Sequence, residues 1–178
     1  MKIVAFGAST SKFSINRQFA HFAARQFDAG VNLIDLNDFE MPLFSVDKEQ
    51  KNGFPDEARK LLEIFEKADF LVISMAEHNG SYTAAFKNTL DWCSRIRGEV
   101  FHGKPMLLLS ASPGKLGAKF VMESALSRFP KHTAQIIGHF SLPSFEENFK
   151  DGTIVNQELA SEFGTLIENV KETLAKIK

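Results

Sequence analysis

The chain has 178 residues, which suits one domain and is long enough to bury a sizeable core. An apolar fraction of 44% and a charged fraction of 24% argue against a disordered chain, a collagen-like repeat or a disulfide scaffold. The net charge of −1 provides no broad field that would attract nucleic acid or anionic lipid. We therefore expect a single domain over residues 1–178, with neither nucleic acid nor a membrane as partner.

The amino terminus enters an apolar segment at Lys2 and lacks the charged region, long apolar stretch and cleavage site of a secretory signal. The longest apolar runs, such as residues 106–109, are far shorter than the roughly 20 residues of a membrane span. Cys93 has no second cysteine with which to form an internal disulfide. These features are compatible with a reducing cytoplasm, and we expect a cytoplasmic protein.

Short apolar runs alternate along the chain with segments of helical period. Taken in chain order, the runs that predict strands are residues 3–6, 31–34, 70–75, 106–109 and a more polar run at 135–140, which suits a sheet edge. Between and after them, apolar residues recur at helical spacing over residues 15–23, 58–65 and, most clearly, 159–174.

Strands that alternate with helices imply parallel pairing through right-handed crossovers, with helices on both faces of one sheet. Five strands suit the flavodoxin-like order 2-1-3-4-5. The expected fold class is therefore α/β, a flavodoxin-like three-layer sandwich with a five-stranded parallel sheet. In this architecture ligands bind beyond the carboxyl ends of the strands, at the topological switch point.

Two features point to additional contacts. Residues 37–54 have no clear period and are long for a connection, which indicates that they fold over a site or a partner. The helix after Tyr82 has two apolar faces, one with Phe86, Leu90 and Cys93 and another with Ala85, Trp92 and Ile96. A helix that is apolar on two sides needs two surfaces to pack against. One is the sheet; the other is either a second subunit or a long loop that covers Trp92.

The first candidate ligand loop is residues 7–16. It carries four hydroxyl side chains before a predicted helix, whose free N–H groups and dipole favour an anion: Ser9, Thr10, Ser11 and Ser14. Hydroxyls donate to phosphate oxygens without adding charge, so the loop predicts a cradle for a phosphate monoester. Neither the Walker A pattern nor the dinucleotide pattern G-x-G-x-x-G is present. The alternative for Ser14 is a helix N-cap with no ligand.

Two further loops follow predicted strands in the same way. In residues 76–82, Asn79-Gly80 turns the chain sharply and exposes backbone groups that suit the edge of a planar heteroaromatic ligand. Taken alone, this segment is an ordinary strand-to-helix connection. In residues 110–117, glycines allow the backbone to approach a ligand closely.

Other chemistries lack support. The five histidines, at positions 21, 78, 102, 132 and 139, show no metal-ligand spacing, so we expect no metal site. The G-x-S-x-G motif of serine hydrolases is absent from the sequence. Lys87 and Asp91 are four residues apart on a helix, as in a surface ion pair.

Together, and in this order, the three loops resemble the NADPH-dependent FMN reductase family, which includes quinone, chromate and azo-dye reductases of flavodoxin-like fold. The resemblance covers roughly residues 2–140. The family pattern G-S-x-R-x-x-S-x-N is matched by Ser9, Ser14 and Asn16. The pattern P-E-Y-N-G-S-Y followed by L-K-N-x-x-D-W is matched by Glu77, Asn79, Gly80, Ser81, Tyr82, Lys87, Asn88, Asp91 and Trp92. The pattern S-x-S-P-G-x-x-G is matched by Ser110, Ser112, Pro113, Gly114 and Gly117.

The chain departs from the family at three positions. Ser11 stands where many members have Arg, so one cationic phosphate contact is missing. Ala76 replaces Pro, and His78 replaces Tyr beside the expected flavin. These differences bear on the choice of electron donor and acceptor more than on the fold.

The resemblance implies an FMN-dependent NAD(P)H oxidoreductase that uses NADPH or NADH as co-substrate and passes electrons to a small acceptor, such as a flavin or quinone, in a ping-pong scheme. It implies a homodimer or homotetramer. The implied phosphate ligands are Ser9, Ser11, Ser14, Ile15 and Asn16; the implied isoalloxazine contacts are Glu77, His78, Asn79 and Gly80; and Ser112, Gly114 and Gly117 complete the pocket. No catalytic side chain is implied, because the flavin carries the chemistry.

Two other classes share the expected fold. A flavodoxin-type electron carrier would dock protein partners and would not react with NAD(P)H, but such carriers are typically strongly acidic. A receiver module would have an acidic pair after the first strand to hold Mg²⁺, and here that position reads Gly7-Ala8-Ser9.

Overall fold

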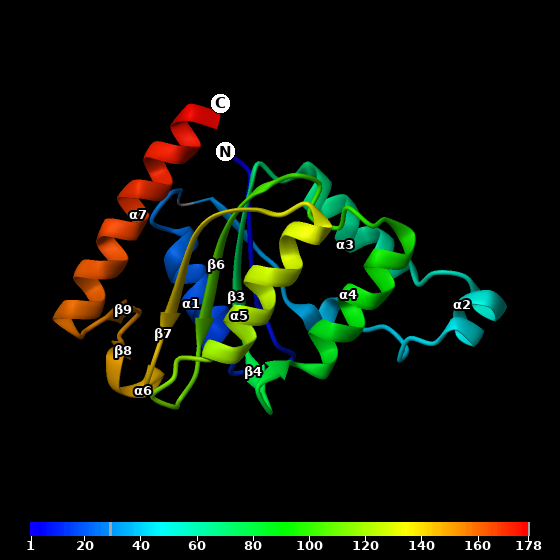
Figure 1. The fold of residues 1–178 in the computed structure, drawn as a ribbon, viewed down its shortest axis with the longest axis horizontal. Coiled ribbons are helices and arrows are strands. Elements are labelled where there is room, and N and C mark those ends of the chain that lie inside the picture. The colour runs from blue at the N-terminus through cyan, green and yellow to red at the C-terminus, as the bar shows by residue number, and fades with distance from the viewer. Residues whose placement is uncertain (29, 178) are drawn as a thin grey trace.

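The computed structural model describes residues 1–28 and 30–177. At its centre lies a sheet in the order β2-β1-β3-β6-β7, in which every neighbouring pair is parallel (Figure 1). Its strands are β1 (Ile3–Ala8), β2 (Val31–Leu33), β3 (Phe70–Met75), β6 (Pro105–Ala111) and β7 (Gln135–Leu142). Numbered as strands of this sheet alone, the order is 2-1-3-4-5, so the predicted flavodoxin-like fold is confirmed.

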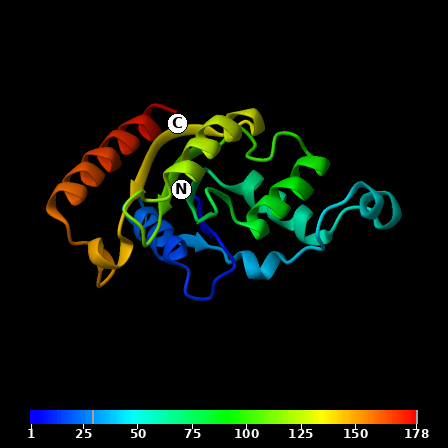
Figure 2. The ribbon, with the colours of Figure 1, turned by 60° about the horizontal axis from the view of Figure 1, so that its bottom comes forward.

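Helices cover both faces of the sheet (Figures 1 and 2). Successive side chains of a strand point to opposite faces, and in β3 Leu71 and Ile73 join one hydrophobic cluster whereas Phe70 and Val72 join the other. The first cluster is completed by α3 (Asp56–Lys67), α4 (Ala84–Ile96) and α5 (Lys119–Arg128). The second is completed by α1 (Ile15–Ala24) and α7 (Gln157–Ile177).

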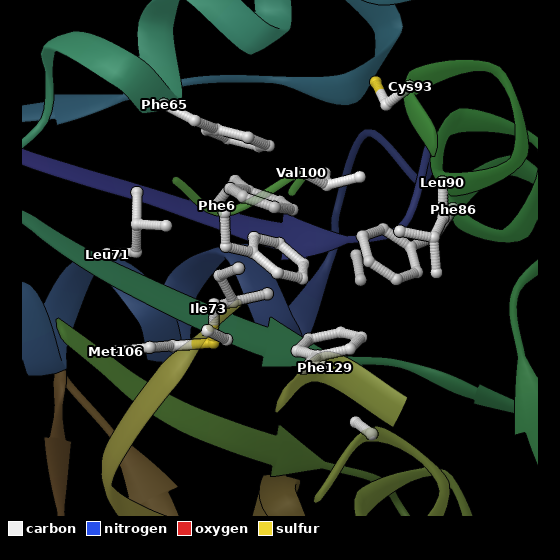
Figure 3. Close-up of a cluster of buried hydrophobic side chains, with 14 of the residues drawn as sticks. Phe6, Phe65, Leu71, Ile73, Phe86, Leu90, Cys93, Val100, Met106 and Phe129 are labelled. Carbon is white, nitrogen blue, oxygen red and sulfur yellow. The ribbon is translucent and has the colours of Figure 1, made fainter. Parts of the chain in front are cut away.

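Aromatic rings hold the first cluster together (Figure 3). The ring of Phe6 on β1 stacks on that of Phe65 on α3, with centroids 5.8 Å apart. It also lies 6.3 Å from the ring of Phe86 on α4. The rings of Phe101 and Phe129 close the cluster, at 4.7 Å from each other. Burial of these large side chains draws α3 and α4 onto β1, whose carboxyl end opens the first ligand loop.

Several short elements were not predicted. They are η1 (Leu36–Phe39), α2 (Val46–Asn52), η2 (Phe129–His132), α6 (Phe145–Asn148), and the hairpins β4–β5 (Glu77–His78, Ser81–Tyr82) and β8–β9 (Phe149–Lys150, Thr153–Ile154). Helix α2 buries no residue and projects from the body of the molecule (Figure 1). Its sequence therefore carries no apolar period, and a 2.8 Å ion pair between Glu49 and Arg95 ties it to α4.

Among the described helices, none is long and apolar enough to span a bilayer.

The long segment of residues 37–54 folds over α4. The indole Nε1 of Trp92 donates to the carbonyl of Pro42 at 2.7 Å, and the ring of Phe44 packs edge-on against the indole at 5.0 Å. The Asn88 side chain accepts from the N–H of Phe44 at 2.8 Å and donates to the carbonyls of Met41 and Pro42. Trp92 is thereby 1% exposed. The long loop therefore covers Trp92, which is one of the two alternatives expected from the sequence. Contact with a second subunit stays a prediction.

Candidate functional site

The three predicted loops meet at the carboxyl edge of the sheet and enclose a cavity of about 240 Å³. Of the residues predicted from the sequence, those that line it are Ser9, Ser11, Ser14, Ile15, Asn16, Glu77, His78 and Ser112. Asn79, Gly80, Gly114 and Gly117 belong to the same loops but lie outside the cavity wall.

The first loop packs unusually tightly against α1. A Cβ atom on Gly7 would lie 2.4 Å from the backbone nitrogen of Arg17, so only glycine allows α1 to begin directly against β1. The hydroxyl of Ser14 accepts from the N–H of Arg17 at 3.1 Å, which confirms that Ser14 is the N-cap of α1. The hydroxyl of Ser9 accepts from the N–H of Ser11 at 3.1 Å. Because a hydroxyl that accepts can still donate, Ser9 and Ser14 retain O–H groups for a ligand.

Backbone amides add to these donors. The N–H groups of Ile15 and Asn16 open α1 and, as amides of the first turn, have no acceptor within the helix. The helix dipole also favours an anion at this end. Within the described part of the chain, no Lys or Arg lines the cavity. The donors are therefore hydroxyls and amides, a set that fits a phosphate monoester.

The Asn16 side chain has a structural role. Its Nδ2 donates to the carbonyl of Ala111 at 3.0 Å, and its Oδ1 accepts from the N–H of Ala111 at 2.9 Å and from the hydroxyl of Ser74 at 2.7 Å. The residue is 2% exposed. The side chain therefore ties α1 to β3 and β6, and only its backbone N–H remains for a ligand.

The second loop is a tight hairpin, more ordered than a plain strand-to-helix connection. Residues Asn79 and Gly80 have φ angles of 52° and 71°, as the central pair of a type I′ turn requires. Glu77 pairs with Tyr82 across the two short strands. Helix α5 has no side-chain cap of its own at Ala118, and the Glu77 Oε2 accepts from the N–H of Val121 at 2.8 Å. Glu77 thus caps α5 from a different loop.

The residues after the hairpin anchor it to the core. The hydroxyl of Thr83, which is 3% exposed, donates to the carbonyl of Ala8 at 2.9 Å and caps α4 by accepting from Phe86 at 3.1 Å. The ring of Tyr82 stacks on that of Phe129 at 6.2 Å. Burial raises the pKa of Tyr82 to about 12, so the phenol stays protonated at neutral pH.

Hydrogen bonds of the Ser110 hydroxyl hold the third loop in place. The hydroxyl of Ser110 donates to the carbonyl of Gly117 at 2.7 Å and lies 2.8 Å from the hydroxyl of Ser141. Gly117 has a φ of 59°, and a Cβ there would lie 3.1 Å from the nitrogen of Pro143. Gly117 therefore packs closely against the segment after β7. Ser112 and Pro113 are the residues of this loop that line the cavity.

Sequence reasoning missed some lining residues. Phe13, Ala76, Ala111 and Pro113 also line the cavity. Phe13 is 87% exposed, and its only sequence signal is an aromatic residue within a loop of hydroxyls. Thr83 was missed as an anchor, although a threonine directly before an apolar helix is a capping signal. No group of three or more potential metal ligands occurs in the described residues.

The fold and the three loops define a flavodoxin-like protein with a cavity, lined by hydroxyl and amide donors, at the carboxyl edge of its sheet. Residues 1–147 match the NADPH-dependent FMN reductase family, and the chain belongs to this family. The resemblance stated from the three loops is thus confirmed.

Known proteins agree with this assignment. The chain is 27% identical over 184 residues to a quinone reductase of Escherichia coli K12, across 96% of this chain and 97% of that protein. It is 34% identical over 120 residues to a 2-hydroxy-1,4-benzoquinone reductase of a Burkholderia species, across 66% of this chain and 63% of that protein.

Two solved structures share the fold. FerB, a flavoenzyme NAD(P)H:acceptor oxidoreductase of Paracoccus denitrificans, superposes with a TM-score of 0.72 at 20% identity, across 97% of this chain and 98% of that one. An azoreductase of Bacillus anthracis in complex with FMN superposes with a TM-score of 0.61 at 16% identity, across 99% of both chains.

The predicted activity and cofactor follow from family membership. The protein is an FMN-dependent oxidoreductase that uses NAD(P)H, as the sequence predicted. This outcome favours a reductase over the electron-carrier alternative.

Proposed function

We propose that the cavity binds the phosphate end of FMN and that the hairpin tip lies along the isoalloxazine. The observation that carries this proposal is that uncharged donors from separate segments line one cavity at the start of α1. With about 240 Å³, the cavity is smaller than the roughly 300–1,000 Å³ of a typical small-molecule pocket. Part of the cofactor must therefore extend past it, toward Asn79 and Gly80.

Each group has a distinct role. The hydroxyls of Ser9, Ser11 and Ser14 donate to the phosphate, together with the amides of Ile15 and Asn16. The backbone of residues 77–80 lines the isoalloxazine edge, and Ser112 closes the third side. Gly114 and Gly117 contribute by shaping the third loop, because the hydroxyl of Ser112 donates to the Gly114 carbonyl at 3.2 Å and Gly117 packs on Pro143.

The chain contributes position and electrostatics. Bound FMN would supply the redox chemistry, by accepting electrons from NAD(P)H and passing them to the acceptor. Backbone N–H groups of the second loop would stabilise negative charge that develops on the bound flavin. No side chain is needed as an obligatory acid or base.

The acceptor is a small molecule, with a quinone or free flavin as the best candidates, since relatives are named quinone reductases and azoreductases. Residues 1–178 act as one FMN-binding domain. The enzyme works as a homodimer or homotetramer, and the projecting α2, with exposed Val46 at its start and exposed Leu43 just before it, suits contact with a second copy.

The phosphate role can be tested with two flavins. Ser9→Ala should weaken FMN binding roughly tenfold or more, since a hydrogen bond to a charged group contributes about 1.5–3 kcal/mol. Riboflavin lacks the phosphate, so its affinity should not change. Fluorescence quenching measures both affinities, with Ser161→Ala on the exposed side of α7 as the control. Equal loss for both flavins, or no loss for FMN, would refute the proposed phosphate cradle.

A further inference from the structure

The β4–β5 hairpin carries a histidine at the candidate flavin site. His78 lines the cavity and is exposed to solvent. It pairs with Ser81 across the two short strands and directly precedes the turn at Asn79 and Gly80. The hairpin stands at the carboxyl edge of the sheet (Figure 1). His78 is therefore placed at the rim of the cavity, on the side where the proposed isoalloxazine extends past it.

The two faces of the hairpin have different surroundings. Successive side chains of a strand point to opposite faces, so Glu77 and its partner Tyr82 point one way and His78 points the other. The Glu77 carboxylate accepts from the N–H of Val121, and the ring of Tyr82 stacks on that of Phe129. These contacts fix one face of the hairpin on α5 and η2. The imidazole of His78 is thereby directed away from the core.

Few side chains at the site can exchange a proton near neutral pH. Among the described residues, Glu77 and His78 are the only titratable side chains that line the cavity, and neither the first nor the third loop contributes one. Glu77 is engaged as the cap of α5. Tyr82 does not line the cavity, and burial raises its pKa to about 12. His78 is the group that remains, and histidine is the side chain whose charge ordinarily changes between pH 5 and 8.

Reduction of a quinone requires a proton donor. A hydride, which carries two electrons and one proton, converts a quinone into the hydroquinone monoanion. NAD(P)H supplies this hydride by way of the flavin. The neutral hydroquinone then needs one further proton on its phenolate oxygen. A general acid within hydrogen-bond reach of that oxygen accelerates such a step.

We propose that His78 donates this proton to the acceptor. An N–H bond of the imidazolium breaks as the O–H bond of the hydroquinone forms, and the exposed imidazole then takes up a proton from solvent. Water supplies the same proton more slowly, so the step is slowed but not abolished without His78. The family pattern has Tyr at this position, and a phenol, which ordinarily ionises at about pH 10, is the weaker acid. This inference rests on the proposed flavin site and quinone acceptor.

Two acceptors that differ in their need for protons test the role of His78. FMN-loaded protein is reduced with NADPH without oxygen and mixed rapidly with duroquinone, which takes up protons, or with ferricyanide, which takes up only an electron. His78→Gln should slow reduction of duroquinone at least tenfold and leave reduction of ferricyanide unchanged. His139→Gln, at an exposed histidine of β7, should change neither rate. Equal slowing with both acceptors, or no slowing with duroquinone, overturns the proposal.

An added acid should replace the missing side chain. Imidazole in the buffer should restore about half or more of the duroquinone rate that His78→Gln loses. Pyrazole has a ring of the same size but is barely protonated at neutral pH, so it should restore none. Equal rescue by the two compounds would mean that His78 fills space and donates no proton.

Ligand binding provides a readout without turnover. Oxidised, FMN-loaded protein is titrated at pH 7 with 4-nitrophenol, whose phenolate mimics the hydroquinone monoanion, and with 4-nitroanisole, which cannot ionise. His78→Gln should weaken binding of 4-nitrophenol at least fivefold and leave that of 4-nitroanisole unchanged. Equal affinity of wild type and variant for 4-nitrophenol overturns the proposal.

The same measurements separate this inference from the proposed function. Wild-type protein that fails to bind FMN contradicts the flavin site and, with it, the role of His78. Wild-type protein that binds FMN but does not reduce duroquinone contradicts the quinone acceptor and the role of His78. If the wild type reduces duroquinone and His78→Gln does so equally fast, only the role of His78 is wrong.

Discussion

The carboxylate of Glu77 accepts a hydrogen bond from the backbone N–H of Val121 at 2.8 Å, and this contact joins the β4–β5 hairpin to the start of α5. Two similar contacts tie the other loops together. Asn16 bonds to the backbone of Ala111, and Thr83 to the carbonyl of Ala8. Because each contact runs from a side chain of one segment to the backbone of another, the three loops are held in place before a ligand arrives.

Loss of the Glu77 contact should be measurable as a lost helix cap. Glu77→Ala is expected to lower the free energy of unfolding by about 1–2 kcal/mol, since a cap contributes about that amount. Glu77→Gln keeps an acceptor oxygen and should lose less than half as much. Urea unfolding of the apoprotein measures both changes. If the Gln variant is as unstable as the Ala variant, capping of α5 is not the role of Glu77.

Removal of the Asn16 side chain should lower the free energy of unfolding more than removal of the Glu77 side chain. Asn16→Ala leaves the buried Ser74 hydroxyl and both backbone groups of Ala111 without their partner, which predicts a loss of about 3 kcal/mol in unfolding free energy. Asn169→Ala, at an exposed position of α7, serves as the control and should change stability by less than about 0.5 kcal/mol. Similar values for the two variants in urea unfolding would contradict the assigned network.

The segment over α4 should loosen when the indole donor is removed. Trp92→Phe keeps a ring but loses the bond from Nε1 to the Pro42 carbonyl, worth about 1 kcal/mol. The amide of Phe44, bonded to Asn88, should then exchange with solvent about fivefold faster. Hydrogen exchange followed by NMR measures this, with the β3 amide of Leu71 as an internal control. An unchanged rate at Phe44 would show that the ring contacts alone hold the segment.

Stability should fall at alkaline pH. Burial raises the pKa of the Cys93 thiol from 9.0 to about 12, and that of Tyr82 from 10.0 to about 12. Between these values the unfolded chain releases protons that the folded chain retains, so unfolding becomes easier as pH rises. The stabilising effect is complete below about pH 9 and is lost by about pH 12.

Urea unfolding over this pH range measures the effect. Cys93→Ala should show a shallower decline that begins nearer pH 10, where only Tyr82 contributes. The same burial predicts that native Cys93 resists alkylation at pH 8, whereas the unfolded chain reacts readily. Rapid alkylation of the native protein would contradict both expectations.

Local patterns were sufficient for the sheet and most of its helices. The apolar runs that became β1, β3 and β6 are continuous because these strands are covered on both faces. The apolar stripe of α7 could be predicted from the sequence because its buried residues face one surface: Phe163, Ile167, Val170 and Leu174. Helix α2 could not be predicted in this way, because none of its residues is buried. Burial of one face is what imposes a helical period on the apolar residues of a sequence.

The sequence by itself determined the fold class, the family and the hydroxyl-rich loop that predicts a phosphate ligand, because each depends on residue types at short spacing. Only the tertiary structure decided that the Asn16 side chain bonds Ala111 rather than a ligand, and that Glu77 caps α5. The contacts of Asn16 and Glu77 join residues 95 and 44 positions apart, and no local pattern specifies which distant backbone group a side chain will meet. That choice is made when helices pack on the sheet.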